Sequence, residues 1–176
     1  ILRLEAQGKL TSYDRLGQHL PGLKGHLAGI TLHQLLTHSS GLTEATGNDY
    51  APLTLPQLID QLNSQSLSHP EGTYHYSNLG YSLLTAVVEQ SSGQSIDEFL
   101  TTQFFNPLGM RHTGYRLPGF SEVQVAHGYR DGEEWGRPND KPWMKDGPYW
   151  NLRGNGGLLS TLGDMYTWFK ALRTDQ

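Results

Sequence analysis

The chain contains no cysteine among its 176 residues, which excludes disulfides, thiolate metal ligands and cysteine nucleophiles. No apolar stretch approaches the roughly 20 residues that a membrane-spanning helix needs. There is no run of Lys and Arg, and 13 basic against 17 acidic residues give a formal net charge of -4. This balance argues against nucleic acid or an anionic membrane surface as a partner. A small molecule or another protein is therefore the expected partner.

What the chain does contain is enough length for one domain and a series of helix-start signals. Three segments, at 31–34, 54–57 and 95–98, begin with Ser or Thr and carry Glu or Gln three residues later, the pattern of a capping box. The first predicts a short helix ending near Gly41. Residues 79–92 carry apolar side chains at helical spacing and predict the longest helix.

The second half of the chain has a different pattern. VQVAHGY at 123–129 alternates apolar and polar residues and is followed by an Asp-Gly pair, which predicts a β-hairpin. Residues 133–153 lack periodicity and predict a long loop. A last helix, capped by Ser160 or Thr161, follows. Its apolar residues are expected to face inward: Leu162, Met165, Phe169 and Leu172.

The first residues, ILRLEAQGKL, are apolar from the outset and have no cap before them. This pattern predicts the tail of a helix whose start lies outside the sequence. We therefore expect a truncated chain that forms a single unit over residues 1–176. Helices would occupy 1–110, the hairpin and long loop 111–157, and the terminal helix 158–176.

The most informative stretch is PEGTYHYSNLGYSLL, residues 70–84, because it puts Tyr76, Ser77 and Asn78 where a turn ends and the longest helix begins. Helix starts expose unpaired N–H groups and carry partial positive charge, so a phenol and an amide there can face an anionic or carbonyl-bearing ligand. The competing interpretation is that Ser77 or Asn78 is simply the helix N-cap, a role that both residue types fill well. The tripeptide alone favours the cap.

The eight histidines invite a metal hypothesis, but none forms an i, i+4 pair with a nearby carboxylate, so no metal site is predicted. His38 is expected to bond backbone near the 37–41 turn. Neither a cofactor nor a phosphate loop is indicated, because the glycines at 154–157 lack the Lys-Ser/Thr that such a loop carries. Tight turning explains these glycines better.

Tryptophans in the long loop have two interpretations. Trp135, Trp143 and Trp150 would either line a ligand cleft or cover an edge of the core. We favour the cleft, because the loop lies between the hairpin and the segment GGLLST.

Four strings occur in order along the chain: ITLHQLLTHSSGL, YHYSNLGYSLLTAVVEQSSGQSIDEFL, FFNPLGM followed by Thr113, and GNGGLLSTLGDMYTWF. Together they resemble the serine β-lactamase-like family, which includes class C β-lactamases, D-Ala-D-Ala carboxypeptidases and related esterases. The resemblance covers nearly the whole chain. It makes ILRLEAQGKL look like the end of the helix that carries the family's nucleophile.

That family uses a Ser-x-x-Lys motif, a Tyr-x-Asn motif and a Lys-Thr-Gly or His-Thr-Gly strand. Only the second is in its proper place, as Tyr76-Ser77-Asn78. The resemblance implies that Tyr76 is the general base for the serine and that Asn78 bonds the substrate carbonyl or amide. A tyrosine, with an ordinary pKa of about 10, needs a neighbouring cation for this task. No Ser-x-x-Lys occurs in the sequence, so the isolated chain is expected to be inactive.

The resemblance thus implies a mainly α structure: the helical region of the α+β fold, with a small β-hairpin and without the main antiparallel sheet. The parent protein would be a serine hydrolase that acts on a small amide or ester through an acyl-enzyme, with Trp150, Gly156 and Gly157 near the substrate. The alternative is a catalytically dead homologue that serves as a ligand-binding or regulatory module. The family suggests a bacterial periplasmic or secreted protein. Truncation would expose an apolar face and favour homo-association.

Overall fold

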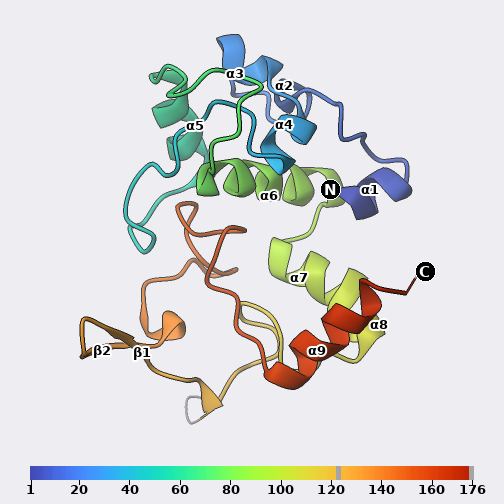
Figure 1. Ribbon diagram of the computed structural model, residues 1–176, viewed down its shortest axis with the longest axis vertical. Helices are drawn as coiled ribbons and strands as arrows, with labels where there is room; N and C mark the ends of the chain where they lie inside the picture. The colour runs from blue at the N-terminus through green and yellow to red at the C-terminus, as the bar shows by residue number, and fades with distance from the viewer. Residues whose placement is uncertain (122–123, 175–176) are drawn as a thin grey trace.

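The structure, a computed structural model, describes residues 1–121 and 124–174 and is organised around one long helix, α6 (Asn78–Ser92), which crosses the middle of Figure 1. Of the helices before it, four lie on one side, namely α2 (Leu16–His19), α3 (Gly25–Gly29), α4 (Leu32–Leu36) and α5 (Leu55–Asn63), and α1 (Leu2–Ala6) lies beside the C-terminal end of α6. The later elements lie on the other side: α7 (Ile96–Leu100), a π-helical turn (Thr101–Phe105), α8 (Asn106–Leu108), the strands β1 (Gly128–Arg130) and β2 (Glu133–Gly136), a 3-10 turn (Pro138–Asp140) and α9 (Leu162–Ala171). The predicted fold class, mainly helical with a small hairpin, is confirmed.

The predicted capping boxes start three of these helices. At the start of α4 the Thr31 hydroxyl accepts from the Gln34 amide at 3.2 Å, and the Gln34 side chain accepts from the Thr31 amide at 2.8 Å. The same reciprocal pairs occur at 54–57 and 95–98. Such caps satisfy N–H groups that a helix start leaves unpaired. Because each cap involves residues only three positions apart, the starts of these helices could be predicted from the sequence.

The end of α4 differs from the prediction. The helix stops at Leu36 and not near Gly41, because His38 takes a left-handed backbone conformation with φ of 55°. Residues 37–41 consequently form a turn that places polar side chains beside the start of α6.

The core lies between α6 and the earlier helices. The buried α6 side chains include Leu79, Leu83, Leu84, Val87 and Val88. Leucines of α1, α2, α4 and α5 pack in the same cluster: Leu4, Leu16, Leu32, Leu35, Leu58 and Leu62. Burying a side chain of this size stabilises the fold by roughly 1.5–3 kcal/mol, so packing, more than helix propensity, holds α6 in place.

The hairpin forms around Asp131 and Gly132, both with positive φ, as the Asp-Gly pair predicts. The strands pair antiparallel and make the one sheet within the described ranges. Val123, where the predicted alternation begins, lies outside the described residues. Across the part of the chain that the structure describes, no helix combines the length and apolar character needed to cross a bilayer.

Buried carboxylates fix the chain between α8 and the hairpin. Asp97, 3% exposed, accepts hydrogen bonds from the amides of residues 115–117 at 2.8, 2.9 and 2.9 Å. Asp164 of α9 accepts from the His112 amide at 2.7 Å and from the Thr113 hydroxyl at 2.9 Å. Because each acid is satisfied by several donors, its charge can be buried at low cost.

The inward orientation predicted for the apolar residues of the last helix is wrong. These residues of α9 and its C-cap are exposed: Leu162 by 88%, Met165 by 48%, Phe169 by 51% and the C-cap Leu172 by 69%. The inward side instead carries Asp164 and Trp168, whose ring centroid lies 5.8 Å from that of Phe104. Periodicity marks the apolar face of a helix, but it does not say which surface covers that face.

Candidate active site

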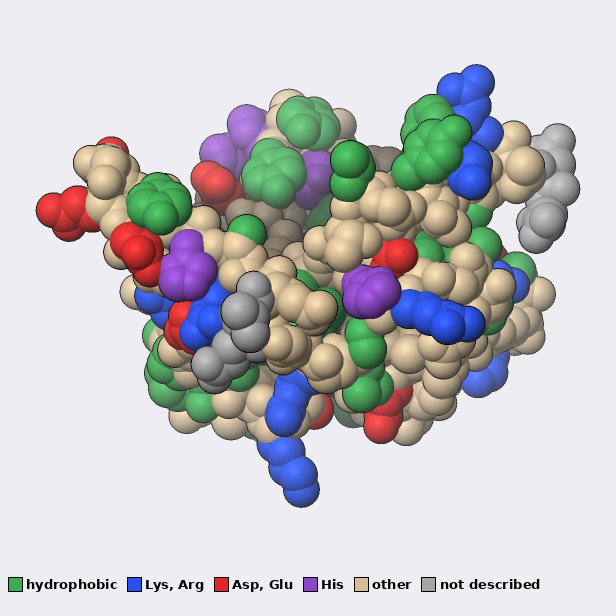
Figure 2. Space-filling view, turned by 90° about the horizontal axis from the view of Figure 1, so that it is seen from below, with side chains coloured by type: hydrophobic (Ala, Val, Ile, Leu, Met, Phe, Trp, Pro, Cys, Tyr) green, Lys and Arg blue, Asp and Glu red, His purple; other side chains and the backbone are tan. Residues whose placement is uncertain are grey.

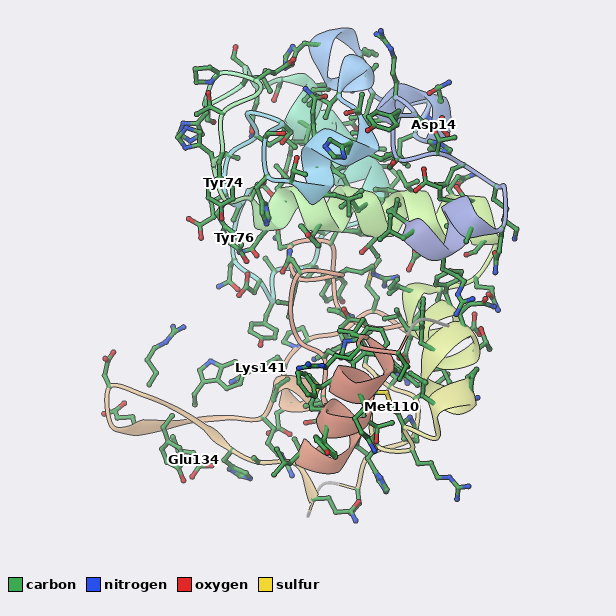
Figure 3. The ribbon with its side chains drawn as sticks, turned by 45° about the vertical axis from the view of Figure 1, so that its right-hand side comes forward. Asp14, Tyr74, Tyr76, Met110, Glu134 and Lys141 are labelled. Atoms are coloured by element: carbon green, nitrogen blue, oxygen red, sulfur yellow. The ribbon has the colours of Figure 1, made fainter. Side chains whose placement is uncertain are left out.

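The candidate site lies at the start of α6. Ser77 is the N-cap of the helix: its buried hydroxyl accepts from the Gly80 amide at 3.1 Å and donates to the Thr43 carbonyl at 2.7 Å. The cap interpretation is therefore right for Ser77, and it leaves the residues on either side available. The Tyr76 side chain is 51% exposed, and its phenol donates to Oδ1 of Asn78 at 2.8 Å. Figure 3 shows Tyr76 at the open end of α6 with Tyr74 beside it.

The loop that carries Tyr76 is fastened to the 37–41 turn by hydrogen bonds between backbone groups. The Ser68 and His69 amides donate to the Gly41 carbonyl at 3.0 and 3.1 Å. The Gly72 amide donates to the Ser39 carbonyl at 2.9 Å, and the His75 amide donates to the His38 carbonyl at 2.8 Å. Gly41 has a φ of 77°, and a Cβ there would lie 2.4 Å from the His69 carbonyl oxygen. Glycine is required at this position because the two segments approach so closely.

His38 joins the turn to the Tyr-x-Asn segment. Its Nδ1 accepts from the Ser77 amide at 3.1 Å. Its ring lies among three tyrosine rings, with centroid separations of 4.7 Å to Tyr76, 5.1 Å to Tyr81 and 5.8 Å to Tyr74. His38 does bond a backbone group, as predicted, but that group belongs to the candidate site and not to the turn.

A segment distant in sequence reaches the first turn of α6 through Asn155. Its Nδ2 group donates to Ser82 Oγ at 2.8 Å, to the Asn151 carbonyl at 3.0 Å and to the Asn78 carbonyl at 3.3 Å. These bonds set residues 151–157 against the residue that follows the cap. Sequence reasoning missed Asn155; an amide side chain between Gly154 and Gly156 was the available signal.

The glycines of this segment turn the chain tightly, as predicted. A Cβ on Gly154 would lie 1.8 Å from Thr85 Oγ1, and Cβ atoms on Gly156 and Gly157 would lie 2.9 and 3.0 Å from Leu152 side-chain atoms. At Gly154 the backbone needs glycine in order to pass, because Cβ of Thr85 would also lie only 2.8 Å away, whereas the Leu152 side chain could move away from a Cβ at Gly156 or Gly157.

Trp150 lies in the core and is 4% exposed. The Arg153 guanidinium covers its ring at 4.9 Å from the centroid. This burial argues against direct contact between Trp150 and a ligand. The indole instead supports residues 151–157 from behind.

Arg153 anchors the same segment and is 1% exposed. Its guanidinium bonds Glu89 at 2.8 Å, Asp146 at 2.6 Å and the Pro148 carbonyl at 2.9 Å. Burial by itself would lower the pKa of Arg153, but the hydrogen bonds and charges of Asp146 and Glu89 raise it. Hydrogen bonds from Arg153 lower the pKa of Asp146. Because Glu89 and Asp146 balance the charge of Arg153, we assign this residue a role in stabilising the fold.

Burial raises the pKa of the neighbouring Tyr115 to about 12, so its phenol stays protonated and takes no part in acid–base chemistry near neutral pH. Tyr76 differs in being solvent-accessible. Within the described ranges, no three His, Asp or Glu side chains gather in a way that would hold a metal ion. What the candidate site offers is a phenol and a primary amide, side by side, at the positive end of a helix.

The arrangement is that of the helical region of the β-lactamase-like fold. A class C β-lactamase from Rhodobacter sphaeroides superposes with a TM-score of 0.74 at 25% identity, over 95% of this chain and 45% of that structure. The beta-lactamase family model matches residues 1–176, so the chain belongs to the serine β-lactamase-like family.

Two curated relatives from Bacillus subtilis (strain 168) are similar over almost the whole chain. The PbpX protein is 31% identical over 173 residues, which is 98% of this chain and 42% of that protein. A penicillin-binding protein is 30% identical over an alignment of 191 residues, which is 99% of this chain and 42% of that protein. The chain thus spans less than half the length of these relatives.

Proposed function

We propose that this chain supplies the Tyr-x-Asn part of a serine hydrolase that acts on a small amide or ester through an acyl-enzyme. The observation that carries the proposal is the accessible pair at the head of α6, in which the phenol of Tyr76 lies 2.8 Å from Oδ1 of Asn78. The buried Ser77 cap ties the end of the loop that carries Tyr76 to the helix that carries Asn78, and catalysis requires such fixed positions.

In the proposed reaction a serine oxygen attacks the substrate carbonyl carbon and its proton passes to the oxygen of Tyr76. Collapse of the tetrahedral intermediate breaks the C–N or C–O bond, and Tyr76 returns the proton to the leaving group. Before this step the phenol must lose its own proton, which a nearby cation favours. While the phenol is protonated, its bond occupies Oδ1 of Asn78 and leaves the Nδ2 group of Asn78 to donate to the substrate carbonyl or amide; the deprotonated Tyr76 oxygen has no proton to give and cannot make this bond.

The serine and its activating lysine are proposed to come from a segment outside these residues. The sequence contains no Ser-x-x-Lys, and the relatives are more than twice as long as the matched region. On this proposal the isolated chain is inactive. Gly156 and Gly157 are proposed to border the substrate, because Asn155 ties their segment to Asn78.

The test is acylation by a fluorescent penicillin and by a fluorophosphonate. The 176-residue chain should take up neither reagent, and stoichiometric labelling would reveal a nucleophile that this proposal lacks. The product of the complete reading frame should be labelled, and Tyr76→Phe should slow labelling by at least about 100-fold, as expected for loss of a general base. Asp60→Asn, a change at an exposed helix position, is the matched control and should label normally.

The second candidate function is a catalytically dead homologue that binds a ligand or regulates a partner through the same site. It is favoured by the absence of Ser-x-x-Lys from the sequence. The complete reading frame discriminates between the two. A Ser-x-x-Lys in it supports the enzyme, and its absence, together with a lack of labelling, supports the binding module.

We also propose that the chain self-associates through the exposed face of α9. Lys170 lies over the Tyr166 ring and Arg173 over the Phe169 ring, so cations cover part of this apolar face. Figure 2 shows hydrophobic and basic side chains next to one another on the surface seen from below. A second copy could bury the same face, since exposed apolar patches promote association.

A further inference from the structure

His38 holds the backbone on both sides of Tyr76. Its carbonyl accepts from the His75 amide at 2.8 Å, and its Nδ1 accepts from the Ser77 amide at 3.1 Å. Two amides that alternate along an extended segment normally bond two acceptors of a neighbouring strand. Here a single residue supplies both acceptors, one from its backbone and one from its side chain, and Tyr76 lies between the two anchors.

The hydrogen bond to Ser77 determines where the imidazole carries its proton. A backbone amide can only donate, so Nδ1 of His38 must present a lone pair. The neutral ring then has its proton on Nε2. A proton on Nδ1 would place two donors face to face and would release Ser77.

Backbone conformation and ring packing aim this side chain. His38 has a φ of 55°, in the left-handed region where histidine and asparagine are enriched over most other residues. Its ring is tilted by 41° against that of Tyr76 and by 31° against that of Tyr81. The Tyr81 hydroxyl is itself bonded to the Leu36 carbonyl at 3.2 Å, so the Tyr81 ring beside His38 is held in place.

We infer that His38, as the Nε2-protonated imidazole, is the positioning residue of this site. Its Nδ1 fixes the Ser77 amide, and its ring limits the Tyr76 side chain to the orientation in which the phenol meets Asn78. The importance of this role rests on the proposed function. The geometry itself exists without substrate and can be measured in the 176-residue chain.

Two substitutions separate the contributions of the acceptor and the ring. His38→Asn keeps an acceptor, because Oδ1 of asparagine is attached to Cγ as Nδ1 of histidine is, and asparagine also tolerates the left-handed conformation. His38→Phe keeps an aromatic ring but has no acceptor. On this inference the asparagine variant retains the Ser77 hydrogen bond and the phenylalanine variant loses it.

The test is NMR of the uniformly ¹⁵N-labelled chain. We expect a through-hydrogen-bond coupling between the Ser77 amide nitrogen and Nδ1 of His38, together with nitrogen shifts of the Nε2-protonated tautomer. In His38→Phe, hydrogen exchange of the Ser77 amide should accelerate about fivefold or more, the factor expected for one lost hydrogen bond. The Tyr76 ring and the Asn78 side-chain amide should shift less in His38→Phe than in His38→Asn, because phenylalanine keeps an aromatic ring against Tyr76.

His38→Asn should keep the Ser77 amide within about twofold of wild type, but its Tyr76 ring and Asn78 side-chain amide signals should shift, because no ring remains at position 38 to limit the Tyr76 side chain. Signals of the distant Tyr115 loop should stay unchanged in both variants, which shows that each is folded. Absence of the coupling, a proton on Nδ1, an unaltered Ser77 signal in His38→Phe, or an unaltered Asn78 signal in His38→Asn would overturn the inference. None of these measurements needs acyl transfer, so failure of the proposed function leaves them readable.

Discussion

The close passage of residues 151–157 over α6 gives the sharpest test of the structure, through the substitution Gly154→Ala. A Cβ at Gly154 would lie 1.8 Å from Oγ1 and 2.8 Å from Cβ of Thr85. Rotating the threonine removes the first clash but not the second, because Cβ does not move with χ1. Thr85 is 5% exposed in the middle of α6, so the segment itself must shift.

The magnitude has two parts. A side chain in the left-handed region costs about 1 kcal/mol, and overpacking a filled site costs roughly 1–3 kcal/mol more. Gly154→Ala should therefore lower the free energy of unfolding by about 2–4 kcal/mol. Gly8 is the matched control: its φ of 69° is similar to the 85° of Gly154, but a Cβ there meets nothing within 4 Å. Gly8→Ala should cost only about 1 kcal/mol.

Urea unfolding followed by circular dichroism measures both variants. The double variant Gly154→Ala with Thr85→Ala should recover only part of the loss, because the alanine retains the Cβ that lies 2.8 Å away. Equal costs for Gly154→Ala and Gly8→Ala would refute the close approach. Such a result would also remove the basis for placing Asn155 against Asn78.

Four further predictions concern charge and surface. Arg153→Met should destabilise the chain by about 2 kcal/mol in urea, because it removes the hydrogen bonds of a buried guanidinium to Glu89, Asp146 and the Pro148 carbonyl, and an unchanged midpoint would contradict the assigned network. Asp97→Asn should cost about 2 kcal/mol, since it weakens hydrogen bonds from three amides to a charged acceptor, and a loss below about 0.5 kcal/mol would count against it. Because the pKa of Asp146 is lowered in the folded chain, its contribution to the free energy of unfolding is complete above about pH 5 and is lost as the pH falls through the ordinary pKa near 3.9 to the lower folded pKa. Asp146→Asn should flatten the dependence of the free energy of unfolding on pH in this range, and equal slopes for wild type and variant would contradict the prediction. Light scattering should show self-association that Leu162→Ser with Phe169→Ser removes, whereas a wild-type monomer at high concentration would exclude the α9 interface.

Features set by neighbouring residues could be predicted from the sequence. Helix starts at 31–34, 54–57 and 95–98 depend on groups within one turn of each other, so the pattern sufficed. The Asp-Gly hairpin depends on two residues that accept positive φ, and it also formed as predicted.

Features set by distant segments could not be predicted. The environment of Trp150 depends on Arg153, and the environment of Arg153 depends on Glu89 in α6. Asn155 gains its significance only when the chain folds back onto Asn78. The face that α9 presents depends on which surface it meets, and its own periodicity cannot supply that information.

The same limit applies to the candidate site. Sequence order placed Tyr76 and Asn78 at a helix start, and the structure puts their side chains in contact. The sequence did not indicate that His38 accepts a hydrogen bond from Ser77, which lies between Tyr76 and Asn78, because His38 and Ser77 are 39 residues apart.

The two hydrogen bonds of the Ser77 hydroxyl have a consequence for protein engineering. The middle position of the Tyr-x-Asn triplet is written as variable, yet here its hydroxyl must both accept from Gly80 and donate to Thr43. A library that randomises position 77 should therefore return serine and little else. A designer who transplants the triplet to a new scaffold must also bring a carbonyl from an adjoining loop to receive that hydroxyl proton.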